Sequence, residues 1–378
     1  MSELEPPVSV IVTSHGRGRL LPRLLEALLS QKPQPLEIIV VVDEPAPGLL
    51  ESLPESERIR LIVRPKRMGK VSALNEALSV SHGTAIVFLD DDVEVRDPGF
   101  IGKVAAALEE ADIVDIKKVV AGRGLLSGLV YVEYLGFNLA SMLLARVAGR
   151  SPAVNGAAFA ARRRLVEALG GFSPVVYEDL DFATRAFLLG ARYGYLGETC
   201  VLNQAPGSWR EWYRQRKRWG LGAALWIRDY FRPLLHAFLE FPHVAAASLV
   251  TALPSLATTV LVMLVDKGYA VKLAYLALLL ASTTMTQLLP VASLISINLH
   301  VAALAARAAL LAAITALLSI PYLVAARVLG VKSRMLLYPV YFFVYQPLWF
   351  TMLLGGMFRA YLLGVEEAED WVVPRRYK

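Results

Sequence analysis

Three consecutive carboxylates, Asp90, Asp91 and Asp92, follow a short apolar run at residues 86–89. The run contains β-branched and aromatic side chains, which predicts a buried strand that ends at the acids. Ligands of open α/β sheets bind beyond the carboxyl ends of the strands, so the acids stand where a ligand is expected. Adjacent carboxylates repel one another and need a cation, and Mg²⁺ and Mn²⁺ prefer such oxygen ligands. Taken alone, an acidic triplet is more often a solvated turn, so the metal-site hypothesis depends on the rest of the chain.

Two later motifs carry further chemically capable groups. Glu178 and Asp179 open a predicted amphipathic helix, where acids ordinarily only complement the helix dipole. Further on, Gln215, Arg218 and Trp219 are spaced i, i+3 and i+4, so a helix places them on one face. Each motif is weak by itself, and their order along the chain gives them weight.

The segments that must position these groups alternate between strands and helices. Strands are predicted at residues 8–13, 36–42, 58–64 and 86–89, with helices at residues 20–30 and around residues 73–75. This alternation indicates a doubly wound, mainly parallel α/β sheet. Polar residues gather after the strands, as a nucleotide site in such a fold requires; they are His15, Asp43, Lys70 and the acidic triplet.

The pair Gly69-Lys70 suggests a phosphate loop but does not complete one. A Walker A motif needs Gly at position 64 and Ser or Thr at position 71, where this chain has Arg64 and Val71. Lys70 therefore remains a candidate for a diphosphate contact through its point charge alone. A surface lysine near a helix start is an equally good interpretation.

The composition divides the 378-residue chain into a globular part and a membrane part. Hydrophobic residues make up 56% of the chain and the mean hydropathy is +0.48, because residues from about 240 to 360 are nearly continuously apolar. Four membrane spans are predicted, at residues 241–265, 273–297, 308–329 and 337–358. Basic residues near 327–334 conflict with a four-span orientation, so an interfacial position for one apolar segment is the alternative.

The region just before the first span is basic and rich in tryptophan. Its charge accounts for the net charge of +6 and favours anionic lipid headgroups, rather than nucleic acid, as the partner. Trp212, Trp219 and Trp226 recur at intervals of seven, which suits a helix lying at a membrane surface. An earlier apolar stretch, residues 125–147, is interrupted by polar residues such as Glu133, which favours a buried or interfacial helix over a span.

The ordered set of motifs resembles the family 2 glycosyltransferases, specifically the membrane branch that contains hyaluronan, chitin and cellulose synthases. The matching segments are VSVIVTSHGR, IIVVVDE, GKVSALNEAL, FLDDDVEV, NGAAFAARR, the GGF before YED, and QRKRW. The resemblance covers most of residues 8–220. It implies a GT-A-type α/β domain that takes a UDP- or GDP-sugar as donor, a divalent metal, Mg²⁺ or Mn²⁺, as cofactor, and a glycan or lipid-linked acceptor.

The resemblance also implies roles for individual residues on the donor side. Asp43 would hold the nucleobase and Asp90 the nucleotide. Lys70 and Arg218 would contact the diphosphate. Asp92 would ligate the divalent ion, which neutralises charge growing on the leaving group.

On the acceptor side, the resemblance implies that Asp179 is the general base that removes the proton of the attacking hydroxyl. Four residues would line the acceptor path, namely Asn155, Gly156, Gln215 and Trp219. Two departures from the family pattern leave the sugar and the acceptor open. Tyr177 stands where the family usually has Thr, and the first loop reads Ser14-His15-Gly16 instead of Thr-Tyr-Asn.

The predicted organisation is a multi-pass protein of the cell membrane with a cytosolic catalytic domain, because the polar first residues show no cleaved signal peptide. Its parts are the GT-A domain at residues 1–205, interfacial helices with the Gln-x-x-Arg-Trp motif at 206–238, about four transmembrane helices at 239–360 and a cytosolic tail at 361–378. A polysaccharide synthase-like activity is expected. The alternatives are a single transfer onto a polyprenyl (dolichyl) phosphate lipid and a catalytically inactive membrane scaffold.

Overall fold

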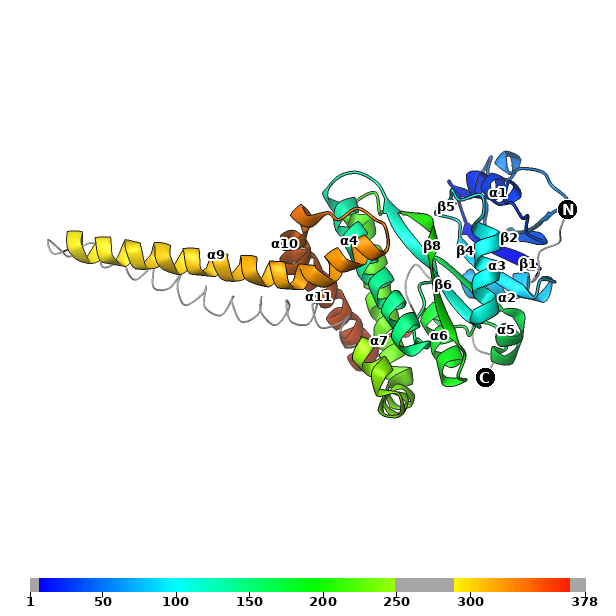
Figure 1. Cartoon of the computed structure of the whole chain (residues 1–378). Coiled ribbons are helices and arrows are strands. Elements are labelled where there is room, and N and C mark those ends of the chain that lie inside the picture. The colour runs from blue at the N-terminus through cyan, green and yellow to red at the C-terminus, as the bar shows by residue number, and fades with distance from the viewer. Residues whose placement is uncertain (1–6, 249–288, 368–378) are drawn as a thin grey trace. The chain divides into compact units, whose positions relative to one another are not determined.

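The computed structural model of the chain describes residues 7–248 and 289–367 (Figure 1). The chain divides into two compact units, residues 1–251 with 351–378, and residues 252–350. Most of the predicted spans at 241–265 and 273–297, and most of the predicted tail at 361–378, lie outside the described residues. The predicted boundary between the catalytic domain and the interfacial helices, at residue 205, falls just before a helix that begins at Trp209.

The first unit is built on an eight-stranded mixed sheet with the strand order β3-β2-β1-β4-β7-β6-β8-β5. The strands are β1 (Val8–His15), β2 (Glu37–Asp43), β3 (Ile59–Arg64), β4 (Ala85–Asp90), β5 (Val93–Val95), β6 (Ile113–Ala121), β7 (Ala158–Arg162) and β8 (Tyr193–Gln204). β1 to β4 are mutually parallel, as predicted, and β6 pairs in parallel with β8. β7 runs antiparallel between β4 and β6, and β5 antiparallel to β8, so the sheet is more mixed than predicted.

Seven α-helices accompany the sheet in the described residues up to 240, and residues 242–248 are helical as well. The seven helices are α1 (Leu21–Leu29), α2 (Lys70–Ser79), α3 (Phe100–Glu110), α4 (Leu125–Leu143), α5 (Arg163–Leu169), α6 (Glu178–Leu188) and α7 (Trp209–Glu240). Short helical turns lie at η1 (Leu50–Ser52) and η2 (Leu144–Ala148). The four strands and two helices predicted for residues 8–89 are all present, with ends shifted by one or two residues.

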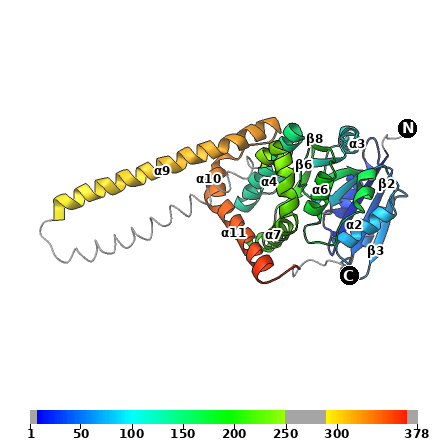
Figure 2. The ribbon, with the colours of Figure 1, turned by 90° about the horizontal axis from the view of Figure 1, so that it is seen from below.

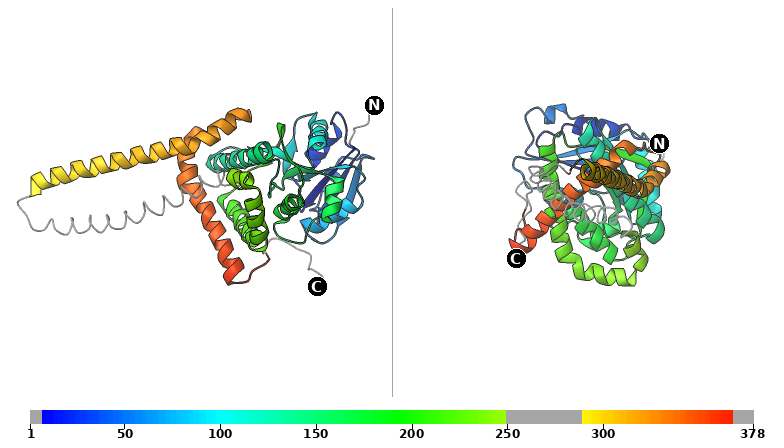
Figure 3. Two further views of the ribbon diagram at one scale, coloured as in Figure 1. Left: turned by 60° about the horizontal axis from the view of Figure 1, so that its bottom comes forward. Right: turned by 90° about the vertical axis from the view of Figure 1, so that its left-hand side faces the viewer.

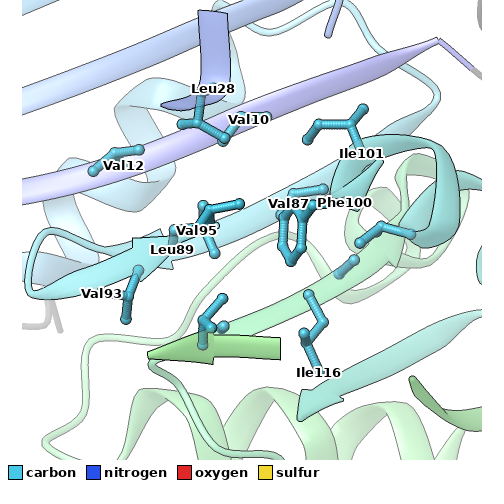
Figure 4. Close-up of a cluster of buried hydrophobic side chains, with 14 of the residues drawn as sticks. Val10, Val12, Leu28, Val87, Leu89, Val93, Val95, Phe100, Ile101 and Ile116 are labelled. Atoms are coloured by element: carbon cyan, nitrogen blue, oxygen red, sulfur yellow. The ribbon is translucent and has the colours of Figure 1, made fainter. Parts of the chain in front are cut away.

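The central strands are buried on both faces, which explains their continuous apolar sequence. Side chains alternate across a strand, so Val10 and Val87 enter one core while Ile11 and Phe88 enter the other. Figure 4 shows the first core, where α3 contributes Phe100. The helices α2, α5, α6 and α7 contribute side chains to the second core. Helices therefore cover both faces of the sheet, which confirms the predicted α/β class.

α4 belongs to the first unit, although its length and composition would allow it to cross a membrane. Its carboxylate Glu133 pairs with Arg216 of α7, and the Asn138 side chain bonds to the backbone N–H and C=O of Lys118. These partners, and the burial of two thirds of its most apolar stretch, fit the predicted buried helix. Figure 2 shows α4 and α7 running beside each other.

The second unit contains the helix α9 (Leu289–Val328), which runs without a break for 40 residues (Figure 3). The sequence prediction placed a connection between spans at residues 298–307, and this is wrong. That stretch contains no Gly or Pro and is rich in alanine and leucine, which favour a continuous helix.

A second helical run follows, composed of η3 (Met335–Leu337), α10 (Tyr338–Val340), η4 (Tyr341–Tyr345), α11 (Gln346–Met357) and η5 (Phe358–Leu362). It contains the span predicted at 337–358. Within the described residues, three segments are long and apolar enough to cross a membrane, namely Leu125–Ala148, Leu311–Val328 and Met335–Leu362.

In the first unit, α7 and the end of α11 meet backbone to backbone at two glycines. A Cβ atom on Gly220 would overlap the carbonyl oxygen of Met352, and a Cβ atom on Gly356 would overlap the carbonyl oxygen of Gly220. Neither obstacle is a flexible side chain that could turn away. The close approach of the two helices therefore requires glycine on both sides.

This crossing predicts a stability difference between neighbouring glycines. Gly220→Ala and Gly356→Ala should each lower the free energy of unfolding by about 1–3 kcal/mol, because the added methyl groups force the helices apart. Gly355→Ala is the matched control, since its methyl group would meet nothing within 4 Å. It should be neutral or stabilise the helix by up to about 1 kcal/mol. Thermal unfolding of the purified full chain measures all three, and equal effects at Gly355 and Gly356 would contradict the crossing.

Candidate active site

A small cleft lies at the carboxyl ends of β1 and β4 and collects polar side chains from four parts of the first unit. The polar and glycine residues that line it are Thr13, Lys70, Asp90, Gly156, Glu178 and Asp179. Aromatic rings form its apolar wall, with Phe88 stacked on Phe159 at 4.7 Å between ring centroids. The structure thus brings together Lys70, Asp90, Gly156 and Asp179, four of the residues singled out from the sequence.

Lys70 lies at the start of α2, directly after Gly69, whose φ of +91° is a conformation that favours glycine. The Lys70 ammonium is 2.7 Å from Asp90 Oδ1 and 3.5 Å from Glu178 Oε1. Burial opposes the positive charge, but these carboxylates outweigh it and raise the pKa of Lys70 above its ordinary range. Lys70 is therefore a fixed cation between two acidic elements.

The acidic triplet at the end of β4 holds three like charges close together. The Ser14 hydroxyl donates a hydrogen bond to Asp91. Desolvation raises the pKa of Asp91 to about 6, with a further contribution from Asp90. Desolvation, then Asp90 and Asp91, raise the pKa of Asp92 to about 7. As a whole residue, Asp92 is the most exposed of the three.

These donors fit a hard divalent ion, since all are oxygens and Mg²⁺ usually takes only one or two carboxylates beside substrate phosphates. Within the described ranges, no three His, Cys, Asp or Glu side chains gather into a complete metal site. The acidic triplet, and Asp92 in particular, would thus share the ion with other ligands.

Asp179 is held by two backbone donors at the start of α6. The Gly156 N–H donates to Oδ2 at 2.9 Å, and the Leu180 N–H donates to Oδ1 at 2.8 Å. The Asn155 side chain accepts a hydrogen bond from the Ala157 N–H at 3.1 Å, so it shapes the turn that presents Gly156. Desolvation in the cleft raises the pKa of Asp179. The carboxylate is fixed and weakly hydrated, as a general base should be.

Asp43 is buried next to the cleft and is occupied by protein groups. Its Oδ2 accepts hydrogen bonds from the N–H groups of Met68 at 2.9 Å and Gly69 at 2.8 Å. Its Oδ1 is 3.2 Å from Nη1 of Arg64, which faces it across the β2–β3 register. Asp43 therefore fixes the loop that ends at Lys70, a structural role that the sequence did not reveal. Its assignment to the nucleobase stays a prediction.

The Gln-x-x-Arg-Trp motif lies on α7, as its spacing predicts. Burial lowers the pKa of Arg218, and the charges of Glu178, Asp90 and Asp179 act on it in the opposite direction. Arg218 therefore faces the acidic cleft. Gln215 and Trp219 both contact the buried side chain of Arg216.

Trp212 and Trp226 have contacts within the first unit that the interpretation of their seven-residue spacing did not anticipate. Trp212 is 3% exposed, and the Trp226 indole N–H donates to the Thr184 hydroxyl at 2.8 Å. The spacing places them on faces of α7 that pack on the rest of the first unit. Buried and interfacial tryptophans share one periodicity, so the sequence could not separate them.

Two residues near the site, Glu178 and Tyr177, were named from the sequence but received no role there. Glu178 is buried beside Lys70, and desolvation raises its pKa to about 7. Tyr177, the departure from the family's threonine, donates a hydrogen bond from its hydroxyl to Asp229 of α7. The Tyr230 hydroxyl also joins α7 to α6, donating to Asp181 at 2.6 Å. A tyrosine reaches α7 where a threonine could not, but no sequence signal marks Asp229 as its partner.

The mixed sheet, the acidic strand end and the fixed carboxylate at the start of α6 define a glycosyltransferase with a GT-A-type fold. Residues 6–222, more than half of the chain, match the family described as "Glycosyltransferase like family 2". The chain belongs to this family.

Relatives named as glycosyltransferases agree with this membership. The probable glycosyltransferase YdaM of Bacillus subtilis (strain 168) is 27% identical over 236 residues, which are 59% of this chain and 56% of that protein. The probable glucomannan 4-beta-mannosyltransferase 6 of Oryza sativa subsp. japonica is 34% identical over 84 residues, 22% of this chain and 15% of that protein. The matches thus span little more than half of these relatives at most.

A similar fold occurs in the mannosyltransferase PcManGT from Pyrobaculum calidifontis, solved in complex with GDP-Man and Mn²⁺. The TM-score is 0.50 at 21% sequence identity, and the match covers 85% of this chain and 86% of that one. At this identity the likeness concerns the fold.

The contact between Gly156 and Asp179 predicts the effect of one methyl group. A Cβ atom on Gly156 would lie 2.7 Å from Asp179 Oδ2, so Gly156→Ala should displace the carboxylate and slow sugar transfer by up to about 10²-fold. Gly99→Ala is the control, because its nearest neighbour would be at an ordinary 3.5 Å. Initial rates of nucleotide release compare the two. A Gly156→Ala enzyme with the wild-type rate would show that Asp179 need not stay where the structure has it.

Proposed function

We propose that the chain is a membrane-bound inverting glycosyltransferase that moves a sugar from a nucleotide-diphospho-sugar to a glycan or lipid-linked acceptor. The observation that carries the proposal is the cleft in which Asp179 lies with Lys70 and Asp90, while Arg218 faces the same acids. A base and a cation in the cleft, with a second cation acting on the same acids, suit an attack on a sugar diphosphate.

Lys70 and Arg218 are proposed to bind the donor diphosphate. Both cations face acids in the structure, so the phosphates would exchange one set of negative partners for another. Arg218 offers a planar fork for two oxygens and Lys70 a point charge. A UDP- or GDP-sugar is the proposed donor. The complex of PcManGT with GDP-Man, in a similar fold, supports this class of donor.

Asp92, next to Asp90 and Asp91, is proposed to hold a divalent ion, Mg²⁺ or Mn²⁺. The oxygen donors at the end of β4 support this, and PcManGT was solved with Mn²⁺. The ion would supply positive charge against the diphosphate as it leaves.

Asp179 is proposed to act as the general base. The acceptor hydroxyl forms a bond to the anomeric carbon, its proton passes to Asp179, and the bond from the anomeric carbon to the diphosphate breaks. Attack from the side opposite the diphosphate inverts the anomeric centre. The N–H donors of Gly156 and Leu180 fix the carboxylate at the cleft, and a second lone pair on each oxygen can meet the acceptor.

A location in the cell membrane, with the catalytic unit on the cytosolic side, is proposed from the apolar helices. Leu311–Val328 and Met335–Leu362 are suited to a membrane by length and composition.

The Gln-x-x-Arg-Trp face on α7 favours a polysaccharide synthase-like reaction over a single transfer to a polyprenyl phosphate. The length of the product separates these. An inactive scaffold would release no nucleotide from any donor.

The metal proposal predicts a dependence on divalent ions. Transfer should vanish in excess chelator and return with Mg²⁺ or Mn²⁺, and Asp92→Asn should abolish turnover and weaken donor binding. Glu110→Gln, an exposed acid on α3, is the control and should behave as the wild type. Nucleotide release measured with a panel of UDP- and GDP-sugars tests this. Full activity in chelator would exclude the metal role.

The base proposal predicts a rate effect that a helix cap would not give. If Asp179 only caps α6, Asp179→Asn should cost about 1 kcal/mol of stability or less and leave turnover nearly intact. If Asp179 removes the acceptor proton, the rate should fall by roughly 10² or more while donor binding persists. Because desolvation raises the pKa of Asp179 and only the deprotonated form accepts a proton, wild-type transfer should increase with pH above the ordinary aspartate value of about 4. A folded Asp179→Asn enzyme with normal turnover would refute the assignment.

A further inference from the structure

Arg216 lies inside the Gln-x-x-Arg-Trp motif but points away from solvent, with 0% of its surface exposed. It forms an ion pair with Glu133 of α4, which is also buried. Nε of Arg216 donates to Oε1 of Glu133 at 3.2 Å, and Nη2 donates to Oε2. Both carboxylate oxygens therefore engage the guanidinium plane, which fixes its orientation as well as its position.

A buried ion pair is costly to form, and apolar residues of similar size are often as stabilising or more so. The pair between Arg216 and Glu133 thus needs a reason other than stability. Such pairs are retained in some proteins because they specify one geometry. The further contacts of Arg216 indicate which geometry this one specifies.

Arg216 contacts two of the proposed acceptor residues directly. The carbon centre of its guanidinium lies 4.0 Å from the centroid of the Trp219 ring, the distance of a cation–π stack. Its Nη1 donates a hydrogen bond to Oε1 of Gln215. The Trp212 ring is further away, with its centroid 5.9 Å from the same carbon. One buried side chain therefore contacts both the Trp219 ring and the Gln215 amide oxygen.

We propose that Arg216, oriented by Glu133, is a positioning residue for acceptor binding, holding Gln215 and Trp219 in the arrangement that receives the acceptor. This inference rests on the proposed function. It assigns α4 a part in acceptor recognition, although Glu133 is buried. Donor binding depends on Lys70, Asp90 and Arg218, so loss of the Arg216 contacts should spare the donor side.

The test uses variants that do not leave a charge buried and unpaired. The double change Glu133→Leu with Arg216→Met removes both charges together. Arg216→Lys keeps a charge but not the planar fork. Arg214→Met, an exposed basic residue two positions away on α7, is the matched control. All are made in the full chain and assayed in membranes with a radiolabelled UDP- or GDP-sugar that the wild type consumes.

Two products are counted, the sugar joined to acceptor and the free sugar released by water. The double variant and Arg216→Lys should shift this partition away from acceptor by roughly tenfold, while the KM for donor stays near the wild-type value. Arg214→Met should leave the partition unchanged. An unchanged partition in the folded double variant would overturn the inference. A wild type that releases no nucleotide from any donor would instead overturn the proposed function.

A spectroscopic measurement separates positioning from folding. With 5-fluorotryptophan incorporated, the fluorine resonance of Trp219 is identified by its loss in Trp219→Phe. In the double variant this resonance should shift or broaden, while that of Trp226, whose indole bonds to Thr184, stays in place. Shifts of equal size at both would mean that the pair only supports the fold, and would count against the positioning role whatever the activity.

Discussion

The first unit has to hold at least five carboxylates around one cleft, and this repulsion is the constraint on which its local structure depends. Asp90, Asp91 and Asp92 end β4, while Glu178 and Asp179 begin α6. Two elements bring cations to them: α2 begins with Lys70, and α7 carries Arg218 to the same acids. Without either cation, like charges would face one another in a poorly hydrated space. The positions of α2 and α7 therefore help to compensate the charge of the acids.

Three of the groups proposed to act on substrate, Lys70, Asp179 and Trp219, are each held by a neighbouring group of the protein. Asp43 fixes the loop before Lys70, and the Gly156 amide fixes Asp179. Glu133 orients Arg216, which in turn contacts Trp219. Asp43, Glu133 and Arg216 belong to strands and helices, whereas Gly156 lies in the turn just before β7. These contacts limit the range of orientations open to each of the three groups, as pre-organised catalysis requires.

Much of the first half of the sheet, β1 to β4, could be predicted because its central strands are buried on both faces and read as unbroken apolar runs. Asp90 was singled out because it ends an apolar strand, whereas Asp179 received its proposed role from the family resemblance, since acids at a helix start are ordinary. Other features depend on pairs that are distant in sequence. The partner of Asp43 across the sheet and the partner of Tyr177 on α7 have no local signature. A break was expected inside α9 because two spans of ordinary length were predicted there. The alanine- and leucine-rich sequence between them instead continues the helix.

The glycine contact between α7 and α11 also has a mechanical meaning. Gly220 follows Trp219 directly, and its backbone rests on the backbone of residues 352–356 with no side chain between them. Side chains between two helices can change rotamer when one helix shifts, but no side chain lies between the backbones at this contact. At this contact, a shift of residues 352–356 therefore acts directly on the backbone that follows Trp219. α7 and the end of α11 are coupled there through their backbones.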